Sequence, residues 1–325
     1  PEDQQAEDEL RLLVQKSDMK VRRSAHFLLL YDTPDKVPEG RKASRADERL
    51  ELLERVYESF LLKFYSRGVA LEIPSERLRV VLFNDHRDYL NFATQLDPGL
   101  QSAAGFWDSR KNVSVFYDQS SHAAFQSVRR LAPRYEQMGD DAIRRKLPNR
   151  ADIIRLANTM ICLANIKQED QDVSVVSHEA THQMAGNTGL LPRGAPIPVW
   201  VHEGLATYFE SPNDAVWAGI GAVNEQRLRW YRALEGDRAH SNIDFIVADQ
   251  IFRTARTHAA ALHGYAQAWA LTHYLMEHHF DKLVAYYRRL GELKADDEPD
   301  ARKLTEIFNR SFGPARSELD AQWRA

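Results

Sequence analysis

Residues 178–182 read His-Glu-Ala-Thr-His, and this stretch decides how the chain is interpreted. Residues i and i+4 of an α-helix lie on one face, so His178 and His182 can direct ring nitrogens at one ion. Glu179 is rotated by about 100° on the helix, which places its carboxylate beside that ion, where it can take a proton from an attacking water. The apolar run VSVV at 173–176 precedes the motif. It predicts a buried helix whose two histidines need partners.

A second helix is predicted at 199–210, and Glu203 in it follows His182 by 203 − 182 = 21 positions. The proline-rich turn LPRGAPIP at 191–198 lets the two helices pack antiparallel, so that Glu203 faces the histidine pair. A catalytic zinc commonly takes three protein ligands plus water. Two imidazoles and a carboxylate favour zinc. We therefore expect one Zn²⁺ per chain, held by His178, His182 and Glu203.

Two longer stretches resemble the gluzincin clan of zinc peptidases, which includes thermolysin and the zinc aminopeptidases. Residues 178–187 read HEATHQMAGN, and residues 200–209 read WVHEGLATYF. In the aminopeptidases the first helix typically continues as HQ, two residues and GN, and the third-ligand helix typically reads WLNEG. The resemblance implies the same three zinc ligands, Glu179 as general base and hydrolysis of a peptide or protein substrate.

A later stretch, HGYAQAWAL at 263–271, resembles another part of the family pattern. The aminopeptidases carry a tyrosine at the start of a later helix, where it polarises the scissile carbonyl and stabilises the oxyanion. The resemblance implies this role for Tyr265, because a donor must lie where charge develops in the transition state. His263 is the alternative donor.

The chain departs from the family pattern at several positions. No Gly-x-Met-Glu-Asn segment is visible, and in aminopeptidases the Glu of that segment grips the free amine, so an endopeptidase is favoured. Thr207 stands where thermolysin has an Asp that orients a zinc histidine. Other side chains must then fix the ligand tautomers. The candidates for that role or for substrate contact are His202, Asn187, Glu210 and His263.

The predicted elements come in the order strands first, helices second, which argues for an α+β fold. We expect a small N-terminal mixed sheet subdomain packed on a mainly helical, thermolysin-like subdomain. Strands are predicted at 24–31, 77–83 and 113–117. Helices are predicted at 8–16, 44–66, 121–137, 150–167, 171–186, 199–210, 222–235, 264–278, 280–290, 301–311 and 314–323.

Three regions are predicted along the chain: a strand-rich part at 1–120, a helical insertion at 121–170 and a zinc-binding catalytic part at 171–325. This layout resembles bacterial peptidase MA-like domains of unknown substrate. Residues 104–118 are expected to supply an edge strand of the cleft, which can hold an extended peptide by main-chain hydrogen bonds.

Composition limits the partners. The 43 Lys and Arg against 47 Asp and Glu give a net charge of −4, which offers no argument for nucleic-acid binding. No apolar run approaches the roughly 20 residues that span a bilayer. The single cysteine, Cys162, excludes an internal disulfide and cysteine-based metal sites. If Pro1 marks a processed N-terminus, we expect an exported bacterial protein; the oligomeric state stays open.

Two other functions fit the same residues. One is a zinc hydrolase that acts on a non-peptide amide or ester. The other is a non-catalytic module that binds a peptide or wall polymer. The presence of Glu179 argues against the second, because a purely structural metal site has no need of a base there.

Overall fold

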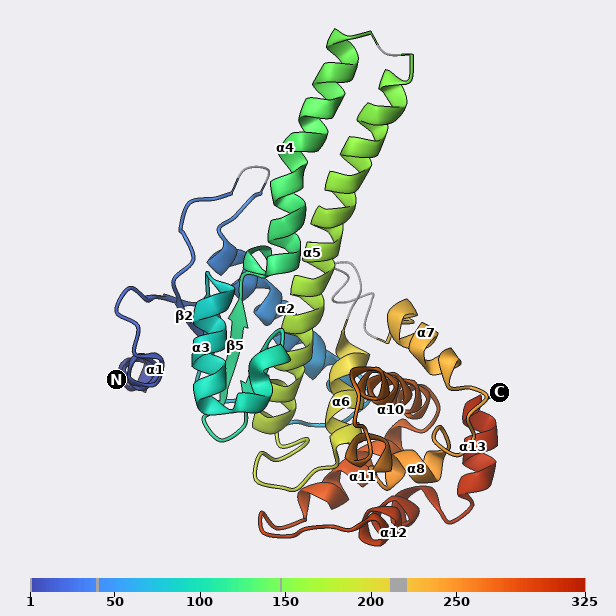
Figure 1. The fold of residues 1–325 in the computed structure, drawn as a ribbon. Coiled ribbons are helices and arrows are strands. Elements are labelled where there is room, and N and C mark those ends of the chain that lie inside the picture. The colour runs from blue at the N-terminus through green and yellow to red at the C-terminus, as the bar shows by residue number, and fades with distance from the viewer. Residues whose placement is uncertain (1, 39–40, 147, 211–220, 325) are drawn as a thin grey trace. The chain divides into compact units, whose positions relative to one another are not determined.

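The fold is α+β, as the order of predicted elements indicates. The computed structural model describes residues 2–38, 41–146, 148–210 and 221–324 (Figure 1). A five-stranded mixed sheet lies in the N-terminal part, and the C-terminal part is mainly helical. None of the helices in these ranges is both long and apolar enough to cross a membrane.

The sheet has the strand order β1-β2-β3-β5-β4. Its strands are β1 (Lys20–Arg23), β2 (Phe27–Tyr31), β3 (Leu78–Phe83), β4 (Phe106–Asp108) and β5 (Val113–Tyr117). β1 is antiparallel to β2, whereas β3 is parallel to both β2 and β5. The three central strands are buried along almost their whole length, which is typical of parallel strands covered on both faces. These three are the strands predicted with bounds, and β1 was not predicted. An edge strand was expected within residues 104–118, and β4 in that range lies at the edge of the sheet, whereas β5 does not.

The helices that concern the candidate site are α2, α5, α6, α7 and α10. Their bounds are α2 (Arg45–Tyr65), α5 (Arg150–Asn187), α6 (Val199–Phe209), α7 (Glu225–Ala233) and α10 (His258–His278). The other helices are α1 (Glu2–Val14), α3 (His86–Leu96), α4 (Ala123–Arg144), α8 (Ile243–Val247), α9 (Gln250–Arg253), α11 (Phe280–Gly291), α12 (Ala301–Phe312) and α13 (Arg316–Arg324).

Helix α5 is continuous where the sequence predicts two helices, at 150–167 and 171–186. The intervening residues Gln-Glu-Asp at 168–170 interrupt the apolar pattern but include neither Gly nor Pro. Their intrinsic cost in a helix is a few tenths of a kcal/mol each, about 0.7 at most. The helix therefore runs through them without a break.

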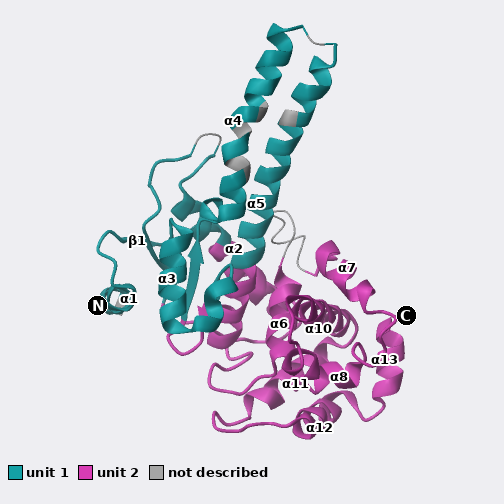
Figure 2. Ribbon diagram, viewed as in Figure 1, with its two compact units in different colours: residues 1–52, 77–106, 113–176 teal, residues 53–76, 107–112, 177–325 magenta. Residues whose placement is uncertain are grey.

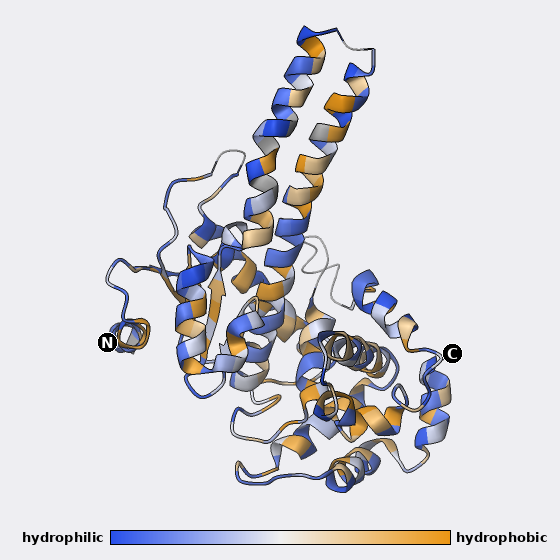
Figure 3. Ribbon diagram, viewed as in Figure 1, coloured by the Kyte–Doolittle hydropathy of each residue, from blue (hydrophilic) through white to orange (hydrophobic). Residues whose placement is uncertain are grey.

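The chain forms two compact units (Figure 2). Unit 1 contains residues 1–52, 77–106 and 113–176, and unit 2 contains residues 53–76, 107–112 and 177–325. Apolar residues are visible on β5 of unit 1 and on α8 of unit 2 (Figure 3). In unit 1, Leu28, Val81 and Phe83 belong to a core of buried side chains. Each such side chain contributes roughly 1.5–3 kcal/mol by its burial.

In unit 1, buried ion pairs hold the part of α5 that ends at Val176. Arg49 on α2 donates to the Asp172 carboxylate on α5 over 2.9 Å, and Arg45 donates to Asp118 over 3.1 Å. Both partners of the first pair are at least 90% buried. The first pair fixes α2 to α5 six residues before His178, and the second fixes α2 to the residue that follows β5.

In unit 2, helix α6 is fixed at its start and along one face. The Asp249 carboxylate accepts hydrogen bonds from the backbone N–H groups of Val199 (3.2 Å) and Trp200 (3.0 Å). It thus caps the N-terminus of α6, where unsatisfied N–H groups favour a negative charge. Along the helix, Gly204 packs so closely on α10 that an added Cβ would clash with the Thr272 hydroxyl.

Candidate metal centre

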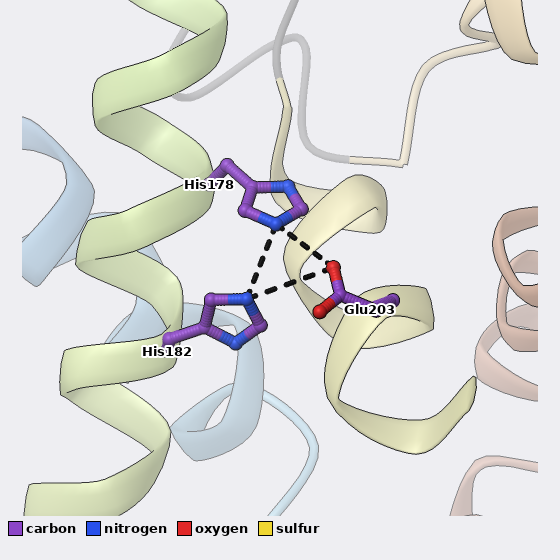
Figure 4. Close-up of side chains that lie close together, drawn as sticks. All are labelled: His178, His182 and Glu203. Atoms are coloured by element: carbon purple, nitrogen blue, oxygen red, sulfur yellow. Dashed lines mark hydrogen bonds and ion pairs between the residues drawn. The ribbon is translucent and has the colours of Figure 1, made fainter. Parts of the chain in front are cut away.

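Three predicted ligands come together in unit 2. His178 and His182 extend from successive turns of α5, and Glu203 extends toward them from α6 (Figure 4). His178 Nε2 lies 3.0 Å from Glu203 Oε2 and 3.1 Å from His182 Nε2, and the distance from His182 Nε2 to Glu203 Oε2 is 3.8 Å. Tetrahedral ligands at about 2.0–2.2 Å from a zinc ion would lie about 3.3 Å apart. This group could therefore hold a metal ion.

The hydrogen bonds of His178 determine which of its nitrogens faces the cluster. Its Nδ1 lies 2.8 Å from Glu210 Oε1, so Nδ1–H donates to this carboxylate. Its Nε2 faces the Glu203 oxygen at 3.0 Å and carries a lone pair whenever the ring is neutral, as it is in a metal ligand. Two electron-pair donors at this distance repel each other unless a proton or a metal cation lies between them. The donor set thus fits a metal.

The electrostatics of the cluster favour a positive charge among these side chains, carried by a proton on His178 or by a metal ion. Burial alone would lower the pKa of His178, but hydrogen bonds with Glu203 and Glu210 raise it well above its usual range. Burial would raise the pKa of Glu203, yet the two histidines lower it. The carboxylate therefore stays ionised, and the cluster attracts positive charge.

Glu210 is itself held by Arg227, which the sequence analysis missed. Arg227 Nη2 donates to Glu210 Oε1 over 2.7 Å, and its Nε donates to Oε2 over 3.2 Å. Asn224 Nδ2 also donates to Oε2, over 3.2 Å. Burial acts to raise the pKa of Glu210, but the charge of Arg227 and the bond with His178 bring it below its usual range. The result is a buried chain of contacts from Arg227 through Glu210 to His178.

Glu179 lies one position after His178 on α5 and is partly exposed. Its carboxylate accepts a hydrogen bond from the backbone N–H of Trp107. Burial raises the pKa of Glu179, although the charges of His178 and His182 act against this shift. The carboxylate is therefore near the ligand group and oriented by the main chain of β4.

Asn187 lies at the end of α5, and its side chain bonds to the Gln183 carbonyl and to a turn rather than to the ligand group. It exchanges two side-chain bonds of 2.8 Å with Asn112, in the turn between β4 and β5. Gln183 donates to the Asn112 carbonyl over 3.5 Å, and Asn112 adopts a positive φ of 51°. The stretch HQMAGN at 182–187 thus fixes the turn that follows Trp107.

Gly186 gives Trp107 its place against α5. A Cβ at this glycine would lie 2.6 Å from Trp107 Cη2 and 2.9 Å from Arg193 Cγ, too close for any real contact. The Trp107 ring stacks near the His182 ring, with centroids 6.4 Å apart and an interplanar angle of 16°. The indole therefore packs beside a ligand because residue 186 has no side chain.

Tyr265 lies on α10 near the ligands, with its ring centroid 6.3 Å from that of His178. The Arg227 guanidinium lies 5.3 Å above the tyrosine ring, and Phe252 packs edge-on against it at 5.6 Å. The negative charge of Glu203, followed by burial, raises the pKa of Tyr265. Its hydroxyl thus keeps its proton and can donate a hydrogen bond.

The two remaining candidate histidines differ in position. The His202 ring lies 5.8 Å from the His182 ring, and burial, helped by His182, lowers the pKa of His202 to about 4. It is therefore a neutral imidazole beside the ligands. His263 Nδ1 lies 3.1 Å from the Trp230 carbonyl oxygen, and its ring packs edge-on against Trp230. Those contacts attach His263 to α7.

A cavity of about 330 Å³ adjoins the ligand group and includes His182, His202 and Glu203 in its lining. A larger cavity of about 510 Å³ is lined by residues of 289–310 and contains no member of the ligand group. A molecule bound in the smaller cavity would therefore lie next to a metal held by the ligand group.

The close contact at Gly204 leads to a prediction about Glu203, its neighbour on α6. Replacing Gly204 by Ala is expected to lower the free energy of unfolding by about 1–3 kcal/mol through overpacking. The added methyl would clash with Thr272 and lie 2.8 Å from the Ala268 carbonyl oxygen, so α6 must move and carry Glu203 with it. Thermal unfolding and metal titration measure both effects.

The matched control is Gly236→Ala, because a Cβ at Gly236 meets nothing within 4 Å. We expect this variant to unfold and bind metal as the wild type does. A Gly204→Ala protein with unchanged stability and metal affinity would contradict the tight packing of α6 on α10.

Comparison with known proteins gives one match. A family described as "Protein of unknown function (DUF1570)" matches residues 172–295. This segment contains the three residues of the ligand group, Glu179, Glu210, Arg227 and Tyr265. No curated protein and no solved structure matches the chain.

Proposed function

We propose that the chain is a zinc-dependent peptidase, of the endopeptidase type, that uses His178, His182 and Glu203 as its metal ligands. The observation that carries the proposal is the convergence of His178 Nε2, His182 Nε2 and Glu203 Oε2, which lie 3.0–3.8 Å from one another while His178 Nδ1 is bound to Glu210. Two imidazoles and a carboxylate suit zinc better than a hard cation such as Mg²⁺. When bound there, zinc would act as a Lewis acid that acidifies water and polarises a carbonyl group.

The residues around the ligands supply the proton transfers. Glu179 takes a proton from the attacking water and returns it to the leaving amine, so that water and the amide become a carboxylic acid and an amine. The Tyr265 hydroxyl donates a hydrogen bond to the oxyanion that develops on the attacked carbonyl. Trp107 keeps the Glu179 carboxylate in place through its backbone N–H.

The substrate is proposed to be an extended peptide. β4 is an edge strand of the sheet, and the backbone N–H of Trp107 in β4 bonds to the proposed general base, Glu179. An edge strand can hold an extended peptide by main-chain hydrogen bonds. Such binding would bring a backbone amide of the substrate near Glu179.

The metal assignment is tested by elemental analysis of the native protein and of His178→Ala. We expect one zinc per chain in the native protein and loss of zinc in the variant, because two ligands bind zinc much more weakly than three. His258→Ala, which removes an exposed histidine of α10, is the control and should keep its zinc.

A native protein with stoichiometric zinc justifies a screen of peptide libraries for cleavage. If neither protein holds metal after zinc is added back, the peptidase proposal is wrong and a non-catalytic binding module becomes the better interpretation. Cleavage of esters or non-peptide amides, with no cleavage of peptides, would instead support a different zinc hydrolase.

A further inference from the structure

The cavity beside the ligand group suggests which substrates the proposed peptidase takes. Its lining includes His182 and Glu203 of the ligand group together with Trp107, Arg193, Ile197 and His202. All of these residues belong to unit 2. We propose that this cavity binds a carboxylate of the substrate close to the scissile bond, with Arg193 as the specificity-determining residue. This inference rests on the proposed peptidase function.

The charges in the cavity lining favour an anion. Glu203 is its acidic residue, and a bound divalent metal would more than neutralise that carboxylate. Arg193 supplies a permanent positive charge. The cavity of the metal-loaded protein therefore carries a net positive charge, which attracts a negatively charged group.

The Arg193 guanidinium can donate further hydrogen bonds. Its side chain is exposed, and among the described residues its hydrogen bond goes to the Ser109 carbonyl oxygen over 3.4 Å, close to the limit for such a bond. A guanidinium has five N–H donors in a planar fork that matches a carboxylate. The bond to Ser109 occupies one of them, so a bidentate contact with a substrate carboxylate remains possible.

The neighbouring residues add charge and an apolar wall. Ser109 also lines the cavity, and the next two residues of its turn, Arg110 and Lys111, are exposed cations. Ile197, Val199 and the Trp107 ring provide apolar surface on which an aliphatic stem can pack. A group with a short aliphatic stem and a terminal carboxylate, such as a glutamate side chain, matches this combination.

The substrate carboxylate can come from two sources, an acidic side chain or the C-terminus of a peptide. The two sources are separated by using three peptides of equal length. The first has one Glu and an amidated C-terminus, the second has Gln in its place, and the third has Gln and a free C-terminal carboxylate. Each is labelled with a fluorophore and titrated with zinc-loaded Glu179→Gln protein, so that binding is measured without turnover.

We expect at least one carboxylate-bearing peptide to bind the zinc-loaded Glu179→Gln protein about tenfold or more tightly than the neutral peptide, as a charge-assisted hydrogen bond predicts. The peptide that shows this preference identifies the source. Adding Arg193→Glu should abolish the preference and favour a peptide with Lys in place of Glu. Arg238→Glu, which reverses an exposed charge outside the cavity lining, is the control and should keep the preference.

Equal binding of the charged and neutral peptides, or no measurable binding of any, would overturn the inference. So would a preference that survives Arg193→Glu. Cleavage assays on the wild type separate the two proposals. A carboxylate preference in binding without any cleavage would contradict the peptidase function alone, whereas cleavage without a preference would contradict the role of Arg193 alone.

Discussion

Replacing Glu179 by Gln is expected to lower peptide hydrolysis by about 10²–10⁴-fold while zinc content stays at that of the wild type. The amide has nearly the same shape as the carboxylate and can still accept the hydrogen bond from the Trp107 backbone N–H. It cannot take a proton from the attacking water. The rate of hydrolysis is measured with a library peptide that the wild type cleaves, and zinc content is measured by elemental analysis of the same preparation.

The matched control is Glu306→Gln, which makes the same change on the surface helix α12. It should keep both turnover and zinc. Wild-type turnover in Glu179→Gln would show that another group is the base. Loss of zinc in Glu179→Gln would show that Glu179 is a ligand, because a group that only transfers protons does not hold the metal.

The residues that come together in the ligand group are those whose spacing is set by local geometry. His178 and His182 meet because four positions make one turn of helix, and Glu203 joins them because a proline-rich turn reverses the chain. Arg227 could not be predicted in this way. It stands among Arg229 and Arg232 on a polar helix, and nothing in the pattern distinguishes an arginine that bonds to Glu210 from one that faces solvent.

The fold shows the same division between local and long-range signals. β2, β3 and β5 are continuous apolar runs and were predicted, whereas β1 has the sequence KVRR and forms a strand through its antiparallel pairing with β2. β4 has three residues, too few for a periodic pattern. Trp107 in β4 thus reaches Glu179 by a contact between segments 72 residues apart in the sequence, which spacing along the chain does not encode.

Replacing Arg227 by Met is expected to lower the free energy of unfolding by about 3–5 kcal/mol, the usual cost of breaking a buried ion pair. Met keeps most of the aliphatic stem but leaves Glu210, whose side chain is 5% exposed, without its bidentate partner. Zinc affinity should fall by about 10–100-fold, because Glu210 then holds His178 Nδ1 less firmly. Chemical denaturation and competition with a zinc chelator measure the two effects.

The double variant Arg227→Met with Glu210→Gln separates the cost of a buried charge from the orientation of the ligand. Without the carboxylate no charge is left unpaired, so much of the lost stability should return. Zinc affinity should stay low, because a neutral amide oxygen accepts the Nδ1–H of His178 more weakly than a carboxylate does. Wild-type zinc affinity in the double variant would show that Glu210 does not orient His178. Stability as low as in Arg227→Met would show that unpaired charge on Glu210 is not what destabilises the single variant.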